Sequence, residues 1–414
     1  MTRSASLVER KILTVPKETW AGLISSLVEA YNMAIYSFTA PFLASLIFDD
    51  SETWSPLFFS YCLAFVGSCL CYPLGAFYYG FMGDREGRRK TCTHSALGLA
   101  IATGLMGLLP LNHSGDLSWI CFLLLLGAQN FFSGGEYHGS IVFSLEHANK
   151  PQNGFMSATS CLFAVFGLCL ANGCAISAMH KELLIRGCFL LGALGGILSY
   201  VLKNYCRETP QFAAVSHASL DKVQLISFFK TEWPAILGAV LILSFYIVSY
   251  SFIFIFLPLV INSDPFDTFK SLMAYGVLLV ISGILADWFS LKKTMTIGAG
   301  LFALTVVFLC YSCSSLLILQ SILTSLACLV IGPMHGWMLQ QFSVQKRCRG
   351  IFISSALSMS LFGGSTVPIC LLLYEQFHSL AVCALFPMIF AVSCAGYLWR
   401  WQPPFPSLAP CPCP

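Results

Sequence analysis

Long apolar runs separated by short polar breaks make up most of the chain. The runs lie near residues 20–46, 57–81, 92–110, 118–145, 155–179, 183–202, 233–261, 270–288, 294–311, 315–342, 350–374 and 379–399. Most of them reach the roughly 20 residues that an α-helix needs to cross the hydrocarbon core of a bilayer. The pattern therefore predicts an all-α membrane protein with twelve transmembrane helices.

The longest internal polar stretch lies between the sixth and seventh runs and divides the chain six plus six. We expect an N-terminal arm (1–19), an N-terminal six-helix bundle (20–202), an inter-bundle loop (203–232), a C-terminal six-helix bundle (233–399) and a Pro/Cys tail (400–414). The arm is basic and lacks the separate short apolar region of a cleaved signal peptide, so we interpret it as a retained segment.

The basic residues predict the orientation of these helices. If the N-terminus is cytoplasmic, all but three of the 22 lysines and arginines lie in cytoplasmic segments, the exceptions being Lys181, Arg186 and Lys270. Cytoplasmic loops of membrane proteins carry such an excess. We therefore expect both termini in the cytoplasm and the acidic loop that begins at Phe48 outside.

Composition excludes several classes of function. Only 10% of the residues are charged, against about 25% in soluble domains, and the net charge of +3 is too small and dispersed for a nucleic-acid partner. Most of the 19 cysteines lie in apolar runs, where a thiol behaves as a small hydrophobe. Cys411 and Cys413 have no second ligand pair nearby, so we expect no metal site. Without a phosphate-binding glycine loop or a nucleophile motif, we expect no enzyme, no cofactor and a monomer.

Three segments recur in the same order in both halves. They pair "GFMGDREGRRK" (80–90) with "GILADWFSLKK" (283–293), "GEYHGS" (135–140) with "GPMHGW" (332–337) and, more loosely, "YSFTAPF" (36–42) with "YSFIFIFLP" (250–258). The first pair shares an aspartate, Asp84 or Asp287, and the second a histidine, His138 or His335. Internal repeats are typical of secondary transporters, and they predict two bundles related by pseudo-two-fold symmetry.

The segment 80–90 fits the pattern G-x-x-x-D-R-x-G-R-R-K. On charge alone it could be an ordinary cytoplasmic loop that faces anionic lipid. The spacing, however, resembles the signature of the major facilitator superfamily, in which the aspartate and arginines form a cytoplasmic latch across the two bundles. The resemblance implies a cytoplasmic gate made of Gly80, Gly83, Asp84, Arg85, Gly87, Arg88 and Arg89, with Asp287 as a weakened counterpart.

Four further segments narrow this resemblance. They begin at Glu29, Tyr72, Phe131 and Arg207, and they are similar to the metabolite:proton symporters, the branch that includes proline/betaine and dicarboxylate permeases. That pattern has an aspartate in helix one and an arginine at the start of the helix-two motif, where this chain has Asn32 and Tyr72. Joint loss of an acid and a base is what a neutralised ion pair would produce, because a lone buried charge is destabilising.

Two intramembrane acids are the candidates for proton coupling. Glu136 lies ten residues before Glu146, near the inner end of helix four, which places it about 15 Å deep. A charge at mid-bilayer is costly, so Glu136 either exchanges a proton as access alternates or stays protonated against a neighbouring helix. Glu29 matches the glutamate of the resembled pattern, and we expect it about a turn inside the cytoplasmic boundary, half solvated.

Polar and aromatic residues within the runs are candidates for a substrate cavity. They are Asn32, Tyr36, Tyr72, Tyr137, His138, Tyr246, Tyr250, His335 and Trp337. Tyrosine and tryptophan faces attract quaternary ammonium groups, although in so aromatic a chain they can equally be packing residues. The symmetry of the two histidines also fits a packing role.

We predict a secondary active transporter of a bacterial inner (plasma) membrane that moves a small polar solute by alternating access, with proton symport through Glu136. By resemblance the solute is a zwitterionic osmolyte or a small carboxylate, and the partners are that solute, protons and the lipid bilayer. The alternatives are a proton-independent uniporter or exchanger, and a non-transporting sensor or scaffold. A polar cavity between the halves would favour a transporter over a scaffold.

Overall fold

The computed structural model describes residues 16–47, 67–109, 115–148, 153–178, 182–214, 225–261, 265–313 and 315–400. Within these ranges the chain is helical and contains no strand. The expected outer loop at Phe48, the tail cysteines Cys411 and Cys413, and nearly all of the N-terminal arm lie outside the described residues.

The first half of the chain forms the helices that we expected from its apolar runs. They are α2 (Lys17–Ile47), α4 (Tyr72–Arg85) preceded by the π-helical turn η1 (Gly67–Cys71), α5 (Arg88–Leu108), α6 (Gly115–His147), α7 (Asn153–Ala178) and α8 (Glu182–Asn204). Pro73 lies in the first turn of α4, directly after η1. The hydrogen-bonding pattern of this span thus changes next to a residue that has no N–H group to donate.

The second half has more interrupted helices. They are α10 (Leu225–Ser251) continued by η3 (Phe252–Phe256) and α11 (Leu257–Val260), α12 (Pro265–Phe289), α13 (Leu291–Ser312), α14 (Leu316–Ile331) followed by α15 (Met334–Gln341), α16 (Arg347–Ser358) continued by η4 (Met359–Gly363) and α17 (Thr366–Phe377), and α18 (Leu380–Arg400). The short α9 (Pro210–Ala213) lies between the two halves. Pro333 separates α14 from α15, because proline cannot donate the helical hydrogen bond at its position.

Joined through these turns, the described segments form twelve helical spans, which agrees with the predicted count. Nine spans within the described ranges are long and apolar enough by themselves to cross a membrane. Large apolar side chains face outward from them, for example Leu304 and Phe308, which are 79% and 66% exposed. Side chains of this kind on an outer helix face are what a lipid environment covers.

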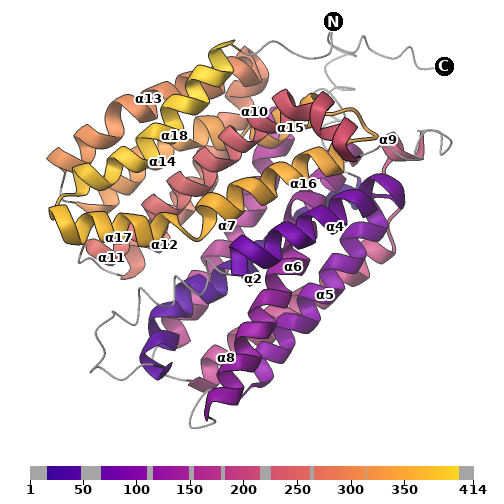
Figure 1. Cartoon of the computed structure of the whole chain (residues 1–414), viewed down its shortest axis with the longest axis horizontal. Coiled ribbons are helices and arrows are strands. Elements are labelled where there is room, and N and C mark those ends of the chain that lie inside the picture. The colour runs from indigo at the N-terminus through magenta and orange to yellow at the C-terminus, as the bar shows by residue number, and fades with distance from the viewer. Residues whose placement is uncertain are drawn as a thin grey trace, which may run out of the picture.

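The two halves lie side by side, the first at lower right and the second at upper left in Figure 1. They meet where α4 packs along α16 and where α7 packs along α12. Some element ends differ from the expected bundle boundaries: α8 continues past residue 202 to Asn204, and α10 begins at Leu225 rather than at residue 233. The extension of α8 places Lys203 inside a bundle and not in the loop.

Candidate functional site

Asp84 joins the two halves at one end of the interface. It is the second-last residue of α4, and its carboxylate accepts hydrogen bonds from the backbone N–H groups of Cys348 and Arg349, both at 3.0 Å. The side-chain Nε of Arg349 donates to the same carboxylate, also at 3.0 Å. The first N–H groups of a helix have no intrahelical partner and carry partial positive charge. Asp84 therefore caps the start of α16 from the opposite half.

Three more charged side chains, those of Arg88, Glu146 and Arg347, surround this contact. Arg88 lies 3.6 Å from the Asp84 carboxylate through Nη2 and 3.3 Å from the Glu146 carboxylate through Nε. Nη1 of Arg347 donates to Glu146 at 2.7 Å. We call Asp84, Arg88, Glu146, Arg347 and Arg349 the latch; each is less than a tenth exposed. Because a buried charge is strongly destabilising once its partner is removed, the latch requires both halves to be in contact.

Two of the predicted gate glycines allow this contact. A Cβ atom on Gly83 would lie 2.9 Å from Sγ of Cys348, and one on Gly80 would lie 3.2 Å from Cα of Arg349. Such distances are tighter than ordinary van der Waals contact. The backbone of α4 therefore approaches the start of α16 as closely as it does because positions 80 and 83 carry no side chain.

The remaining predicted gate residues hold the start of α5. Gly87 has a positive φ of 105°, a conformation that glycine adopts readily, and it turns the chain from α4 into α5. The Glu208 carboxylate then accepts hydrogen bonds from the backbone N–H groups of Arg88 and Arg89, both at 3.1 Å. Nη1 of Arg89 donates to the carbonyl of Cys206 at 3.2 Å. The loop after α8 thus fixes the helix that carries Arg88.

Arg85 points outward and is exposed, so it lies beside the latch and not within it. Glu86 and Lys90 form an exposed ion pair nearby, and the hydrogen bond from Lys90 lowers the pKa of Glu86 below its ordinary value. Exposed pairs of this kind contribute little to stability. The energetic weight of the region therefore rests on the buried latch.

Asp287 makes the reciprocal contact. It stands near the end of α12 in the second half, and its carboxylate accepts hydrogen bonds from the backbone N–H groups of Gly154 and Phe155 at the start of α7, both at 2.8 Å. A Cβ atom on Gly283 would lie 2.7 Å from the carbonyl oxygen of Gly154. Each half therefore caps one helix of the other with an aspartate, as the sequence repeat suggests. At Asp84 an arginine side chain adds to the two backbone bonds.

A cavity of about 210 Å³ lies between the halves. Residues of α2, α4, α6 and α7 line it on one side and residues of α10, η3, α16 and η4 on the other. Ile255 of η3 and Met359 and Gly363 of η4 belong to the lining, and Tyr72 directly follows η1. Each π-helical turn of the described chain is therefore at or next to the cavity, as is common for such turns at functional sites.

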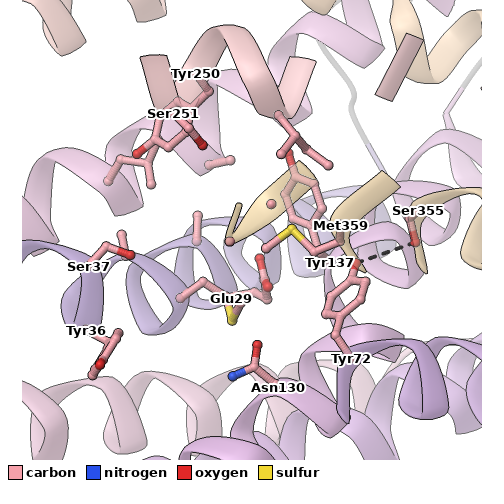
Figure 2. A pocket seen from close by; sticks show the side chains of 18 of the residues that line it. Glu29, Tyr36, Ser37, Tyr72, Asn130, Tyr137, Tyr250, Ser251, Ser355 and Met359 are labelled. Atoms are coloured by element: carbon pink, nitrogen blue, oxygen red, sulfur yellow. Dashed lines mark hydrogen bonds between the residues drawn. The ribbon is translucent and has the colours of Figure 1, made fainter. Parts of the chain in front are cut away.

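Two hydroxyl contacts join the halves across this cavity. The Tyr72 hydroxyl donates to Oγ of Ser355 at 3.5 Å, the dashed line in Figure 2. The hydroxyls of Tyr137 and Tyr246 are also 3.5 Å apart. Hydrogen bonds of this length are weak. The cavity walls are thus joined loosely, whereas the latch is joined tightly.

The structure brings some of the predicted cavity residues together and separates others. Those in the lining are Tyr36, Tyr72, Tyr137, His138, Tyr246 and Tyr250. Asn32 is not among them: its side-chain Nδ2 donates to the carbonyl of Gly192 in α8 at 3.3 Å. Nor are His335 and Trp337, which are buried in α15 and do not belong to the lining. The sequence could not tell which face of each helix meets the cavity, and a substrate role for the six lining residues stays a prediction.

Glu29 lies deeper than we predicted. It is 4% exposed and lines the cavity, so the expectation of a half-solvated residue near the boundary is wrong. Its carboxylate accepts a hydrogen bond from the Ser133 hydroxyl of α6. Figure 2 shows it within the cavity, with Tyr36 and Ser37 further along α2. Glu29 is the one carboxyl group among the lining residues that the structure describes.

Glu136, the residue on which the predicted proton coupling rested, is not in the cavity lining. It lies inside the first half, where it forms an ion pair with Lys203 and accepts a hydrogen bond from Ser95 at 2.7 Å. Ser140 and Ser199 also donate to it, at 3.2 and 3.3 Å. The sequence interpretation placed Lys203 in the loop and therefore missed this partner. Glu136 is thus a paired buried charge that links α5, α6 and α8.

The two repeat-related histidines do meet. The ring centroids of His138 and His335 are 5.6 Å apart across the interface of the halves. Nδ1 of His335 lies 3.5 Å from Sγ of Cys161, whereas both ring nitrogens of His138 lack a hydrogen-bond partner among the described residues. His138 therefore belongs to the cavity lining while both of its ring nitrogens are buried without a partner in the described part of the chain.

Residues 22–280 match the sequence pattern of the Major Facilitator Superfamily. The chain belongs to this superfamily. Its fold is also that of solved members: the proton:xylose symporter XylE gives a TM-score of 0.71 at 17% sequence identity and covers 93% of this chain and 95% of its own. The human organic anion transporter MFSD10 gives 0.68 at 12% identity, with 92% and 99% covered. Both comparisons concern the fold alone.

Curated relatives of this major facilitator are transporters. It is 26% identical over 379 residues to the inner membrane metabolite transport protein YhjE of Escherichia coli K12. The aligned region covers 84% of this chain and 85% of the relative. It is 23% identical over 416 residues to the proline/betaine transporter of Salmonella typhimurium LT2, with 91% and 81% covered. The predicted family and its transporter class are therefore confirmed.

Several residues of this major facilitator that form the site were missed by the sequence analysis. Lys203 and Glu208 fell within the expected inter-bundle loop, Glu146 near the inner end of helix four, and Arg347 between the tenth and eleventh expected runs. The sequence did contain an indication of their role, since each is a charged residue within one or two helical turns of an apolar run. Which charges pair depends on contacts between segments far apart in the chain, and periodicity does not report those contacts.

The replacement of an ion pair by Asn32 and Tyr72 finds no support in the geometry. Asn32 bonds to α8 within the first half, whereas Tyr72 faces the cavity and bonds to α16 of the second half. The two side chains thus engage different neighbours, which counts against a direct ancestral pair between these positions. Tyr72 contributes its phenol ring to the cavity wall.

Proposed function

We propose that this major facilitator is a secondary transporter that moves a small polar solute by alternating access between its two halves. The observation that carries the proposal is the combination of an inter-bundle cavity, lined by Glu29 and five tyrosines among mostly apolar groups, with a latch that holds one end of the interface closed. A decayed scaffold would need neither feature. The cavity volume of about 210 Å³ is below the usual 300–1,000 Å³ of ligand pockets, so the solute is compact.

Proton symport, the coupling that we predicted, is assigned in this proposal to Glu29 and not to Glu136. Glu136 is neutralised by Lys203 and lies outside the cavity, so a solute would not meet it. Glu29 lies in the lining, where it is exposed to whichever side the cavity opens. A buried carboxyl that alternates between two access paths is a common proton relay in transporters.

The position of the latch indicates to which side of the membrane the cavity is closed. The basic residues predict that the latch end faces the cytoplasm, which makes the conformation described here closed to the cytoplasm. The Escherichia coli relative is named as an inner membrane protein, and we propose the equivalent bacterial membrane for this chain. Of the two solute classes that we predicted, small carboxylates would be repelled by an ionised Glu29, whereas the ammonium group of a zwitterionic osmolyte would be attracted to it.

Uptake into proteoliposomes tests the function. We expect a labelled panel of zwitterions, organic cations and dicarboxylates to show at least one saturable substrate, with faster uptake when the solute side is made acidic. Glu29→Gln should abolish the effect of the pH gradient, while Glu29→Asp should retain part of it.

Uptake that ignores both the pH gradient and Glu29→Gln would leave transport intact and replace symport with uniport or exchange, the alternative that we kept open. Folded protein that moves no member of the panel would overturn the transport proposal and favour a sensor or scaffold. Folding is checked in each case by a cooperative thermal transition of the reconstituted protein.

A further inference from the structure

The charge in the cavity lining has one sign only, and it is negative. Glu29 is the one acidic residue of the described lining, and that lining contains no lysine or arginine. The nearest ion pair of the first half, Glu136 with Lys203, is internally neutral. The basic members of the latch are matched to the acids of the latch. A solute in the cavity therefore meets at most one formal charge, and that charge is negative.

The uncharged part of the lining suits a positive group. Five tyrosines face the cavity, on both halves: Tyr36, Tyr72, Tyr137, Tyr246 and Tyr250. Aromatic faces attract cations through their quadrupoles, by about 0.5–1 kcal/mol when exposed and about 2 kcal/mol or more when desolvated. They give no comparable stabilisation to a carboxylate. Tyrosine faces and Glu29 thus favour the same sign of charge on the solute.

Position 72 is where a base could have stood. The pattern that this segment resembles places an arginine at the position of Tyr72, and Tyr72 lies in the cavity wall with its hydroxyl bonded to Ser355. An arginine there would offer a bidentate partner to a carboxylate. The phenol offers a hydrogen bond and an aromatic face but no charge. In this chain the cavity therefore lacks a charged partner for the anionic end of a zwitterion.

Besides the serine and tyrosine hydroxyls, which carry no charge, His138 and the amides of Gln129 and Asn130 are the lining groups that could donate to a carboxylate. The amides already donate within the protein, Gln129 to the carbonyl of Asn32 at 3.1 Å and Asn130 to the carbonyl of Leu126 at 2.8 Å. His138 has unused ring nitrogens, but a neutral imidazole supplies a hydrogen bond and no charge. Desolvating a carboxylate without a cationic partner is expensive.

We propose that the cavity selects compact organic cations over zwitterions, neutral solutes and anions, with Glu29 as the counter-charge and the tyrosines as the walls. The inference rests on the proposed transport function and names the solute class of that same cavity. It takes exchange, the alternative to symport, as the coupling, because a proton and an organic cation compete for the single carboxylate of Glu29. It departs from the relative named a proline/betaine transporter, because betaine and proline each carry a carboxylate that this cavity leaves without a charged partner.

Four isosteres with nearly the same shape test the selectivity. Choline and glycine betaine share a trimethylammonium group, and 3,3-dimethylbutan-1-ol and 3,3-dimethylbutanoate are their counterparts with carbon in place of nitrogen. Binding to the full chain in lipid nanodiscs is measured by isothermal titration. We expect choline to bind at least tenfold more tightly than each of the other three.

Two variants test the cause. Glu29→Gln should reduce the affinity for choline to that of its neutral isostere. Tyr72→Arg should remove the preference for choline and raise the affinity for betaine. Ser177→Ala, which changes an exposed hydroxyl bonded to its own helix, is the matched control and should keep the preference. Thermal unfolding of each variant shows whether it is folded.

Betaine binding as tightly as choline to the wild-type protein overturns the inference. If that betaine affinity also disappears in His138→Gln, the histidine is the carboxylate partner that the inference denies. Equal affinity for choline and its neutral isostere, or no saturable binding of choline and tetramethylammonium, overturns it as well. Uptake of betaine without binding of choline refutes the selectivity and leaves the transport function standing, whereas no uptake of any solute refutes both.

Discussion

Oδ2 of Asp84 lies 3.0 Å from the backbone nitrogen and 3.0 Å from Nε of Arg349. One carboxylate oxygen thus holds both the start of α16 and the side chain of that residue, and it does so from the other half of the protein. Closure of this end of the interface therefore depends strongly on the single carboxylate of Asp84.

Asp84→Asn should open the latch end. The amide keeps the shape but loses the charge that Arg88 and Arg349 face, and breaking a buried ion pair costs about 3–5 kcal/mol. Maleimide labelling of Cys348, which is 1% exposed in the closed latch, should rise several-fold when followed by mass spectrometry. Asp287→Asn is the matched control, with a smaller expected effect. An unchanged labelling rate in Asp84→Asn would contradict the assigned role.

Gly83→Ala should act on the same contact by steric means. The added Cβ would lie 2.9 Å from Sγ of Cys348, so α4 and α16 must move apart. We therefore expect a lower midpoint of thermal unfolding. Gly300→Ala is the control, since a Cβ there meets nothing within 4 Å. It should leave stability unchanged or raise it by up to about 1 kcal/mol, the gain of alanine over glycine in a helix. A Gly83→Ala protein as stable as Gly300→Ala would disprove the close approach.

Lys203→Met should be among the most destabilising single changes in the first half. It strands the Glu136 carboxylate in the protein interior, at a cost of about 3–5 kcal/mol. The double variant Lys203→Met with Glu136→Gln removes both charges and should recover much of the loss in a denaturation series. Solute affinity of the double variant should match the wild type, because neither residue lines the cavity. A double variant no more stable than Lys203→Met alone would show that the pair is not coupled.

His138→Leu should raise stability and lower transport. An unpartnered buried polar group costs about 1–3 kcal/mol, so its removal should raise the midpoint of thermal unfolding, while uptake falls because the cavity loses a hydrogen-bonding side chain. His335→Leu serves as comparison; its ring contacts Cys161, and its replacement should stabilise less. Unchanged uptake in a more stable His138→Leu protein would leave His138 as a packing residue, the other role that the sequence allowed.

Much of the fold was predictable because its signals are local. Hydrophobic runs placed the spans, and the glycines and charges of segment 80–90 placed the gate. Those features are read from neighbouring residues or from a repeat within one chain. The matching positions of Asp84 and Asp287 also predicted a symmetric pair of contacts, although not that each aspartate would cap a helix start in the opposite half.

The candidate site was less predictable because it depends on which faces and which distant charges meet. Glu136 was the most conspicuous intramembrane acid, yet its partner Lys203 lay one residue beyond the expected end of a span. Glu29 was counted from the expected start of helix one and so placed too close to the boundary. In a chain with so few charges, an error of about one helical turn is enough to change which carboxyl group is expected in the cavity.

The reciprocal caps on α7 and α16 also bear on how the molecule is assembled. Each half carries an aspartate near the end of one helix, Asp84 of α4 or Asp287 of α12, that accepts hydrogen bonds from the first N–H groups of a helix in the other half. Two halves made as separate polypeptides would each present both members of this exchange. Pairing of one first half with one second half satisfies all of them at once, so the caps provide a rule for stoichiometry and relative orientation that acts before any solute is bound.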